Sequence, residues 1–113
     1  MSSGGVTQGS SGPFVRVAEL WIDPAQLERY KAAVKEEIET SVRIEPGVLA
    51  IYAVAEKDNV SKLRFFEIYV DEAAYKTHIA SAHFRRDVET TKDMITSRAL
   101  FDTVPILLGA KEK

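Results

Sequence analysis

The sequence predicts an α+β fold of the ferredoxin-like type, in which a split β-α-β arrangement builds one four-stranded antiparallel sheet with helices on one face. The order of hydrophobic periodicities along the chain is β-α-β-β-α-α-β. A length of 113 residues suits a single hydrophobic core. Residues 1–12 are rich in Gly and Ser, so we assign them to a flexible leader and residues 13–113 to one domain.

Composition and charge exclude several classes of partner. The net charge of −2 offers no basic surface to nucleic acid. Cysteine is absent, which excludes disulfides, thiolate nucleophiles and Cys-ligated metals and fits a reducing compartment. The sequence contains no recognisable signal peptide or membrane-spanning segment. We therefore expect a soluble, cytoplasmic protein with no nucleic-acid partner and no membrane partner.

The first strand and the first long helix are predicted before residue 45. Residues 14–22, FVRVAELWI, are rich in β-branched and aromatic side chains, with Arg16 and Glu19 as the only charges. Asp23-Pro24 then favours a helix start, because Asp accepts hydrogen bonds from free amides and Pro is tolerated in the first turn. An apolar stripe at helical spacing follows, formed by Leu27, Tyr30, Val34, Ile38 and Val42.

A hairpin is predicted next, after Glu45-Pro46-Gly47 ends the helix. Residues 48–56 are apolar at nearly every position, which predicts a central strand covered on both faces. A polar turn at residues 57–61 joins this strand to another at residues 62–70. The sheet face opposite the helices would be covered most simply by a second copy, so we expect a homodimer; a monomer with an unusually apolar sheet face is the alternative.

Two short helices and a last strand complete the predicted order. Asp71 caps a helix that ends near Ala80, and Ser81 caps another. One face of the second helix is predicted to hold Phe84, Val88, Thr91 and Ile95. Residues 99–108 form the last predicted strand, with Pro105 at an edge or bulge because proline has no amide hydrogen to donate.

Candidate catalytic groups are concentrated in residues 65–84. Glu67 shares a strand face with aromatic neighbours such as Tyr69, where a desolvated carboxylate must find a donor or take up a proton. The alternative is a Glu that reaches solvent or makes a structural hydrogen bond. His78 lies on one helical face with Tyr75 and is the best candidate for a general base, since a neutral imidazole can accept a proton from a phenol. A packed or surface histidine is the alternative for this residue.

The second histidine, His83, follows the Ser81 cap, where the positive helix end favours a neutral imidazole. A hydrogen bond from His83 to the turn is an equally good interpretation. Five residues separate His78 from His83 across a predicted helix break, and this spacing matches no compact metal-ligand pattern. We therefore expect no metal site.

Several short motifs, taken in order, resemble one known family. They are Ala18-Glu19, the Glu45-Pro46-Gly47 turn, Phe66-Glu67-Ile68-Tyr69 leading into Asp71-Glu72-Ala73-Ala74, His78-Ile79-Ala80-Ser81 and His83-Phe84. The chain resembles the antibiotic biosynthesis monooxygenase domain family over residues 17–95. The resemblance implies a dimeric α+β barrel with quinol monooxygenase-like activity, which oxidises a hydroxylated aromatic substrate with O2 and uses no flavin, haem or metal cofactor.

The resemblance also implies a pocket between the sheet and the helices. His78 would deprotonate a small quinol or phenol, with Glu67 holding or polarising its imidazole. The residues enclosing the substrate would be Leu20, Phe65, Tyr69, Tyr75, His83, Phe84 and Val88, with His83 at the mouth. Val88 stands where the haem-degrading branch of the fold has an axial histidine, so haem cleavage is not expected.

Two other functions remain open at this stage. An isomerase or tautomerase of the same fold could use the same base without consuming O2. A non-catalytic stress-response dimer could bind a ligand in the same pocket, and a pocket filled by core side chains would exclude the enzymatic interpretations.

Overall fold

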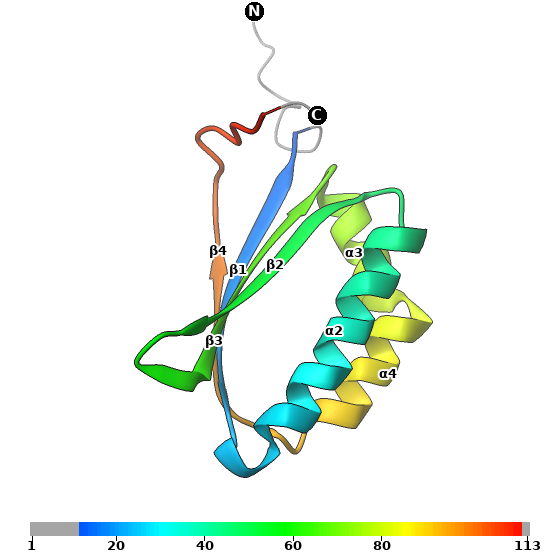
Figure 1. Ribbon diagram of the computed structural model, residues 1–113. Coiled ribbons are helices and arrows are strands. Elements are labelled where there is room, and N and C mark those ends of the chain that lie inside the picture. The colour runs from blue at the N-terminus through cyan, green and yellow to red at the C-terminus, as the bar shows by residue number, and fades with distance from the viewer. Residues whose placement is uncertain (1–11, 112–113) are drawn as a thin grey trace, which may run out of the picture.

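The computed structural model describes residues 12–111 and folds them into one antiparallel sheet with helices on one face only (Figure 1). The strands are β1 (Phe14–Ile22), β2 (Val48–Glu56), β3 (Asn59–Tyr69) and β4 (Ile95–Asp102). The helical layer consists of η2 (Pro24–Gln26), α2 (Leu27–Ile44), α3 (Glu72–Ala80) and α4 (Ala82–Thr91). The predicted α+β, ferredoxin-like fold is confirmed. The predicted leader lies outside the described residues, apart from Gly12.

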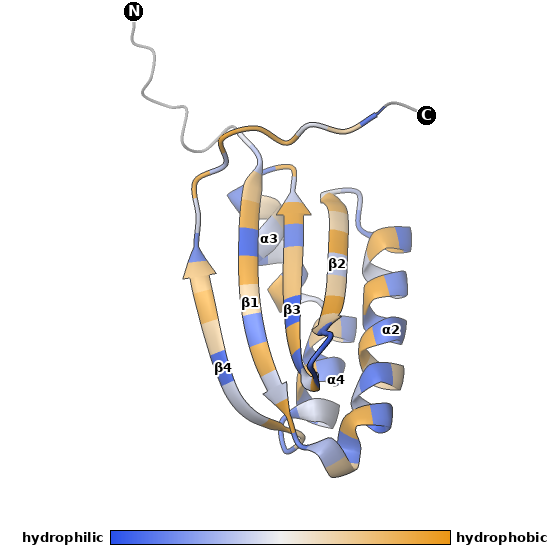
Figure 2. Cartoon of the chain, turned by 60° about the vertical axis from the view of Figure 1, so that its left-hand side comes forward, coloured by the Kyte–Doolittle hydropathy of each residue, from blue (hydrophilic) through white to orange (hydrophobic). Residues whose placement is uncertain are grey.

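The strand order in the sheet is β2-β3-β1-β4, so the prediction that residues 48–56 form a central strand is wrong. β2 is hydrophobic along most of its length (Figure 2), yet it lies at an edge. Its side chains on the face away from the helices are uncovered in the chain; Tyr52 and Val54 are each 60% exposed. The apolar residues on both faces of β2 do not show that this chain covers both faces. The outer face of the strand could be covered only by another molecule.

The boundaries of three elements differ from the predicted ones. β3 begins at Asn59, which pairs with Glu56, so the hairpin loop has two residues rather than five. α4 ends at Thr91, and Ile95 opens β4 instead of sharing a helical face. The chain turns earlier than predicted because the Asp23 amide donates to the Met94 carbonyl (2.8 Å), which brings residue 95 against β1.

The last strand therefore covers residues 95–102, not 99–108, and Pro105 follows the strand rather than sitting at an edge or bulge within it. Among the described residues, no helix is both long enough and apolar enough to cross a membrane.

Local signals in the sequence set the other boundaries as predicted. Asp71 accepts a hydrogen bond from the Ala74 amide (2.8 Å) at the start of α3, and Ser81 accepts one from the Phe84 amide (3.3 Å) at the start of α4. Gly47 is needed in the turn between α2 and β2, because a Cβ there would lie 2.5 Å from the Ala74 Cβ. This turn therefore packs directly against α3.

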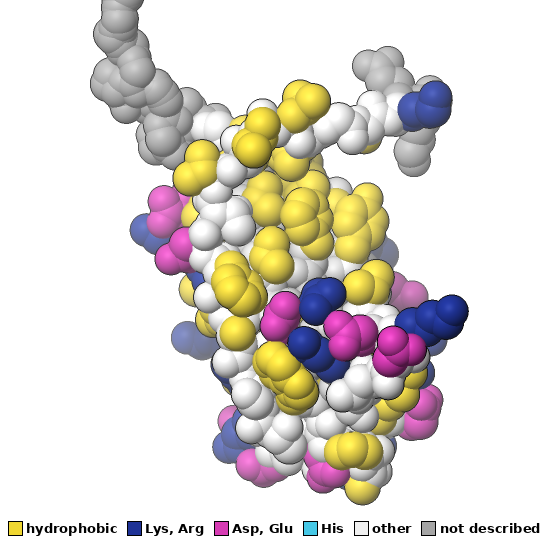
Figure 3. Space-filling model, turned by 90° about the vertical axis from the view of Figure 1, so that its left-hand side faces the viewer, with side chains coloured by type: hydrophobic (Ala, Val, Ile, Leu, Met, Phe, Trp, Pro, Cys, Tyr) yellow, Lys and Arg dark blue, Asp and Glu magenta, His cyan; other side chains and the backbone are white. Residues whose placement is uncertain are grey.

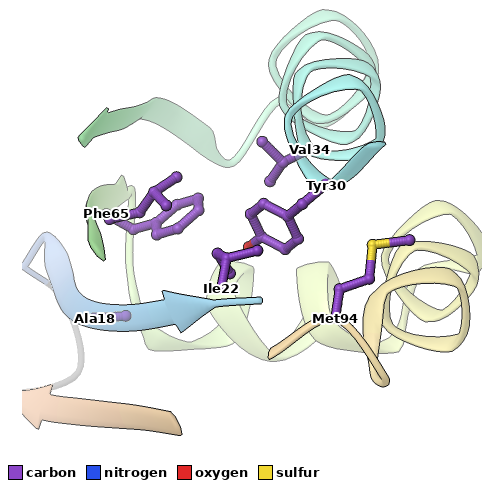
Figure 4. Close-up of a cluster of buried hydrophobic side chains, with 7 residues drawn as sticks. Ala18, Ile22, Tyr30, Val34, Phe65 and Met94 are labelled. Carbon is purple, nitrogen blue, oxygen red and sulfur yellow. The ribbon is translucent and has the colours of Figure 1, made fainter. Parts of the chain in front are cut away.

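The core lies between the helices and the inner face of the sheet, the face that points toward the helices. One cluster of buried side chains comes from β1, β3, α2 and the turn before β4: Ala18, Ile22, Tyr30, Val34, Leu63, Phe65 and Met94 (Figure 4). A second cluster, at the other end of the sheet, consists of Val48, Ile51 and Tyr69. The predicted alternation along β3 is confirmed, because Leu63, Phe65 and Tyr69 are buried while Arg64, Phe66 and Val70 are exposed.

The outer face of the sheet, which points away from the helices, is largely apolar (Figure 3). The register pairs Tyr52 with Phe66, Phe66 with Val17 and Val17 with Phe101 across all four strands. A charged group interrupts this surface, where Arg64 lies 3.1 Å from both Glu19 and Glu56.

Candidate active site

A cavity of about 170 Å³ lies between the inner face of the sheet and the helices. Most of the site residues predicted from the sequence line it: Leu20, Phe65, Glu67, Tyr75, His78, Phe84 and Val88. Two predicted residues do not line it, namely Tyr69, which is fully buried behind Glu67, and His83. The pocket next to His78 is thus open space and is not filled by core side chains.

His78 is held between two glutamates, Glu37 on α2 and Glu45, the residue that directly follows α2. Its Nδ1 lies 3.0 Å from Glu45 Oε2, and its Nε2 lies 3.5 Å from Glu37 Oε2. The imidazole is 2% exposed and has aromatic neighbours, with ring centroids 5.0 Å from Phe84 and 5.5 Å from Tyr69. With the ring proton on Nδ1, His78 donates to Glu45 and keeps a lone pair on Nε2. Glu45 therefore orients this histidine and favours the tautomer with its proton on Nδ1.

His83 shares the Glu45 carboxylate with His78. Its Nε2 lies 2.5 Å from Glu45 Oε2 and 3.2 Å from the Ser81 hydroxyl. His83 lines a second, smaller hollow between α2 and α4, which also contacts Glu37. The expected hydrogen bond to the turn is therefore present, and the expected position at the mouth of the cavity is not.

Glu37, His78 and His83 could together hold a metal ion, because their ligand atoms all lie within 4.8 Å of one another. The spacing of the two histidines alone could not reveal this, since the carboxylate comes from α2. In the structure the same histidines are engaged with Glu45, whose carboxylate accepts hydrogen bonds from both imidazoles. The cluster is thus a connected hydrogen-bond network centred on Glu45.

Glu67 is the carboxylate on the sheet side of the cavity, and its hydrogen-bond partner is Tyr69, whose hydroxyl donates to Glu67 Oε1 (2.6 Å). Burial raises the pKa of Glu67 above its ordinary value, while the hydrogen bond from Tyr69 and the charge of His78 lower it in part. Burial, and next the charge of Glu67, raise the pKa of the Tyr69 phenol. Glu67 is therefore a carboxyl group that can hold a proton beside the cavity.

Several further charged residues line the cavity and were not predicted as site residues, among them Arg16 on β1, Asp87 on α4, Lys92 and Arg98. Within the described part of the chain, Arg16 Nε and Asp87 Oδ1 are buried without a hydrogen-bond partner. Burial, and next the charge of Glu37, raise the pKa of Asp87 to about 6. Period-two alternation could have indicated Arg16, because it shares a strand face with Leu20; no comparable signal marked Asp87.

This arrangement combines the elements of proton-transfer chemistry in one place. A histidine oriented by Glu45 and a protonatable carboxyl border a cavity whose other walls are largely apolar and aromatic. Such a site can remove a proton from a small aromatic molecule and keep water away from the resulting anion.

Comparisons with known proteins agree with the fold. The sequence profile described as antibiotic biosynthesis monooxygenase matches residues 13–90. A solved structure from Bacteroides thetaiotaomicron, provisionally described as an antibiotic biosynthesis monooxygenase, is 50% identical over 90% of this chain and 97% of its own, with a TM-score of 0.85. A comparison with curated proteins found no match.

More distant structures share the same architecture. A protein from Lactobacillus acidophilus, provisionally described as a monooxygenase, is 28% identical over 81% of this chain, with a TM-score of 0.78, although the match covers 44% of that longer chain. A protein from Nitrosomonas europaea is 20% identical over 83% of this chain and 92% of its own, with a TM-score of 0.75, and shows a shared fold alone.

Proposed function

This chain belongs to the antibiotic biosynthesis monooxygenase family, and from that premise we propose that it oxidises a small quinol or phenol with O2 and without a cofactor. One observation carries the proposal. His78 borders an open cavity, donates through Nδ1 to Glu45, and so keeps an accepting Nε2.

The reaction is deprotonation followed by oxidation. His78 Nε2 takes the phenolic proton, and the phenolate then gives an electron to O2. The neutral phenol is a much poorer electron donor. One oxygen atom ends on the ring carbon and the other leaves as water, so that a phenol plus O2 gives a quinone plus water, and a quinol plus O2 gives a hydroxyquinone plus water. No external reductant is needed, because the substrate itself supplies the electrons.

The remaining predicted residues have supporting roles in this proposal. Glu37, 3.5 Å from His78 Nε2, would stabilise the imidazolium after proton transfer. Glu67, held by Tyr69, would hydrogen-bond a substrate oxygen. The apolar and aromatic residues Leu20, Phe65, Tyr75, Phe84 and Val88 would enclose the ring, and His83 would position His78 through their shared contact with Glu45.

We further propose that the protein is a homodimer joined through the outer face of the sheet. Apolar side chains on this face remain well exposed in the single chain, including Tyr52, Val54, Phe66 and Phe101. A contiguous apolar surface of this kind is typical of an interface, and a twofold dimer would cover it with the same face of a second copy.

The catalytic proposal is tested by O2 uptake with 1,4-dihydroxybenzene as the substrate. His78→Ala is expected to lower kcat by about a hundredfold or more, because the general base is lost. His78→Gln keeps a hydrogen bond to Glu45 and guards against a folding defect. His83→Gln removes only a group that positions His78, so it should lower turnover less than either His78 variant. Unchanged turnover in both His78 variants would remove the assignment.

The alternative functions have distinct outcomes in the same assay. Conversion of substrate with no O2 consumption would identify an isomerase or tautomerase. Binding without any conversion would identify a ligand-binding dimer.

A further inference from the structure

We propose that the site is built for a single-ring quinol or phenol that carries a carboxylate, held between Arg16 on the sheet and Asp87 on α4. This inference rests on the proposed function for the reacting hydroxyl, and it adds the size and charge of the substrate. It follows from the cavity volume and from two buried polar atoms of residues that line the cavity, the donor Arg16 Nε and the acceptor Asp87 Oδ1, neither of which has a hydrogen-bond partner among the described residues.

The cavity volume sets the number of rings. At about 170 Å³ the cavity is close to the roughly 150 Å³ that holds one benzene molecule in a protein interior. Its apolar wall includes Phe65 on one side and Phe84 on the other, which suits one aromatic ring between the sheet and the helices. A second fused ring would exceed this volume and would have to extend through the open side of the cavity.

Arg16 provides the site for an anion. Its guanidinium lies 4.6 Å from the centre of the Tyr75 ring, which holds the side chain against the wall. Its Nη1 is 3.7 Å from the carboxylate of Asp102, a side chain that is 94% exposed, and this long contact leaves Nε free. A buried guanidinium N–H without an acceptor is costly, and a carboxylate is the acceptor that matches it best.

Asp87 provides the complementary end of the site. Its buried Oδ1 has no donor among residues 12–111, and the residue lines the cavity from α4. A phenolic hydroxyl on the ring would donate to this oxygen. The ligand that satisfies both walls therefore has an anionic acceptor at one end and a hydroxyl donor at the other.

The test is calorimetric titration without O2, which measures binding independently of turnover. The three probes differ by one group at a time: 1,4-dihydroxybenzene, 2,5-dihydroxybenzoate and 1,4-dihydroxy-2-naphthoate. The carboxylate of the benzoate should lower the Kd about tenfold relative to the plain quinol, as expected for one charge-assisted hydrogen bond. The naphthoate should bind more weakly than the benzoate.

Variants assign the effect to the two residues. Arg16→Gln should abolish the advantage of the carboxylate, so that the benzoate and the plain quinol bind this variant with equal Kd. Arg16→Lys should keep part of the advantage. Asp87→Asn should weaken all the probes that fit. Arg43→Gln, on the exposed end of α2, is the matched control and should behave as the wild type. Melting temperatures verify that each variant is folded.

The inference is overturned by equal affinity for the plain quinol and the benzoate, by an advantage that survives Arg16→Gln, by tighter binding of the naphthoate, or by no binding of any probe. Tight, Arg16-dependent binding of the benzoate with no O2 uptake would instead reject the proposed oxidation and leave the substrate class standing.

Discussion

The two faces of the sheet are built from the same strands and have opposite properties. Phe65 and Phe66 are neighbours in β3, yet Phe65 on the inner face is 6% exposed and Phe66 on the outer face is 39% exposed. On the inner face, Arg16 and Glu67 line a cavity between the sheet and the helices. The outer face is apolar apart from the ion pairs of Arg64 at its centre.

In the proposed function, this difference assigns catalysis to the inner face and dimer formation to the outer face. On the inner face, burial is the main cause of the raised pKa of Glu67, so the fold itself prepares that group for proton transfer. On the outer face, the paired Arg64 is accessible to water, where such ion pairs contribute at most about 1 kcal/mol and serve mainly to fix register. In the proposed function, the polar groups of the inner face take part in proton transfer because the chain buries them. Those of the outer face would only pair with one another within the dimer interface.

The largest expected effect is the difference between removing Phe65 and removing Phe66. Phe65→Ala leaves a cavity in the core and should lower the free energy of unfolding by about 3–5 kcal/mol. Phe66→Ala should have a smaller effect that grows with protein concentration, because in the proposed dimer that side chain is covered by the second copy. Denaturant unfolding at several protein concentrations checks both. A concentration-independent loss of similar size in the two variants would mean that the faces do not differ in this way.

The next effect concerns Glu45, which orients the base. In Glu45→Gln the amide can donate to His78 Nδ1, which favours the tautomer with its proton on Nε2 and blocks proton acceptance there. We expect kcat to fall about a hundredfold with little change in KM.

Glu39→Gln, on the exposed side of α2, is the matched control for this variant. Steady-state O2 uptake across a pH range is the measurement. If kcat falls equally in both variants, or if only the melting temperature of Glu45→Gln changes, Glu45 has no role in orienting His78.

A third prediction concerns the outer face alone. Tyr52→Glu introduces a charge opposite Phe66 and, by symmetry, a second charge in a twofold dimer, so the dimer dissociation constant should rise about tenfold or more. Val42→Glu changes an exposed apolar residue on the helical layer and should leave association unchanged. Sedimentation velocity over a range of concentrations measures both. Wild-type protein that stays monomeric at the highest concentration would reject the dimer itself.

The sequence predicts the inner face better than the outer one, for physical reasons. Alternation along residues 62–70 and the caps Asp71 and Ser81 are local, and they locate Glu67 and His78 correctly in the fold. The edge position of β2 cannot be predicted from local sequence. An apolar strand has the same residue pattern whether its faces are buried by this chain or by another one.

The sequence also did not indicate Glu45 as the hydrogen-bond partner of His78. Glu45 looks like part of a helix-ending turn, and only the packing of α2 against α3 and α4 brings its carboxylate to both histidines, 33 and 38 residues away along the chain. The same holds for Asp87, whose environment depends on Glu37 from α2. Pairings of this kind come from tertiary contacts that no sequence period encodes.

The smallest predicted effect tests whether burial on the inner face controls ionisation. The pKa of Asp87 is raised from 3.8 to about 6, chiefly by burial, with Glu37 adding to the shift and His78 opposing it. The folded protein thus holds this proton more tightly than the unfolded chain does. The stability due to Asp87 is complete below about pH 4 and is lost as the pH rises through 6.

Asp87→Asn removes this titration. Relative to the variant, the wild type should therefore lose about 1 kcal/mol between pH 4 and pH 7, since solvent screening reduces the effect of a partly exposed group. This corresponds to a change of about 4 °C or more in the difference between the two melting temperatures. Asp58→Asn, in the exposed hairpin loop, is the control and should show no such trend. A difference between wild type and Asp87→Asn that stays constant across this range would mean that Asp87 ionises as freely as a surface carboxylate, and that burial on the inner face does not control ionisation on α4.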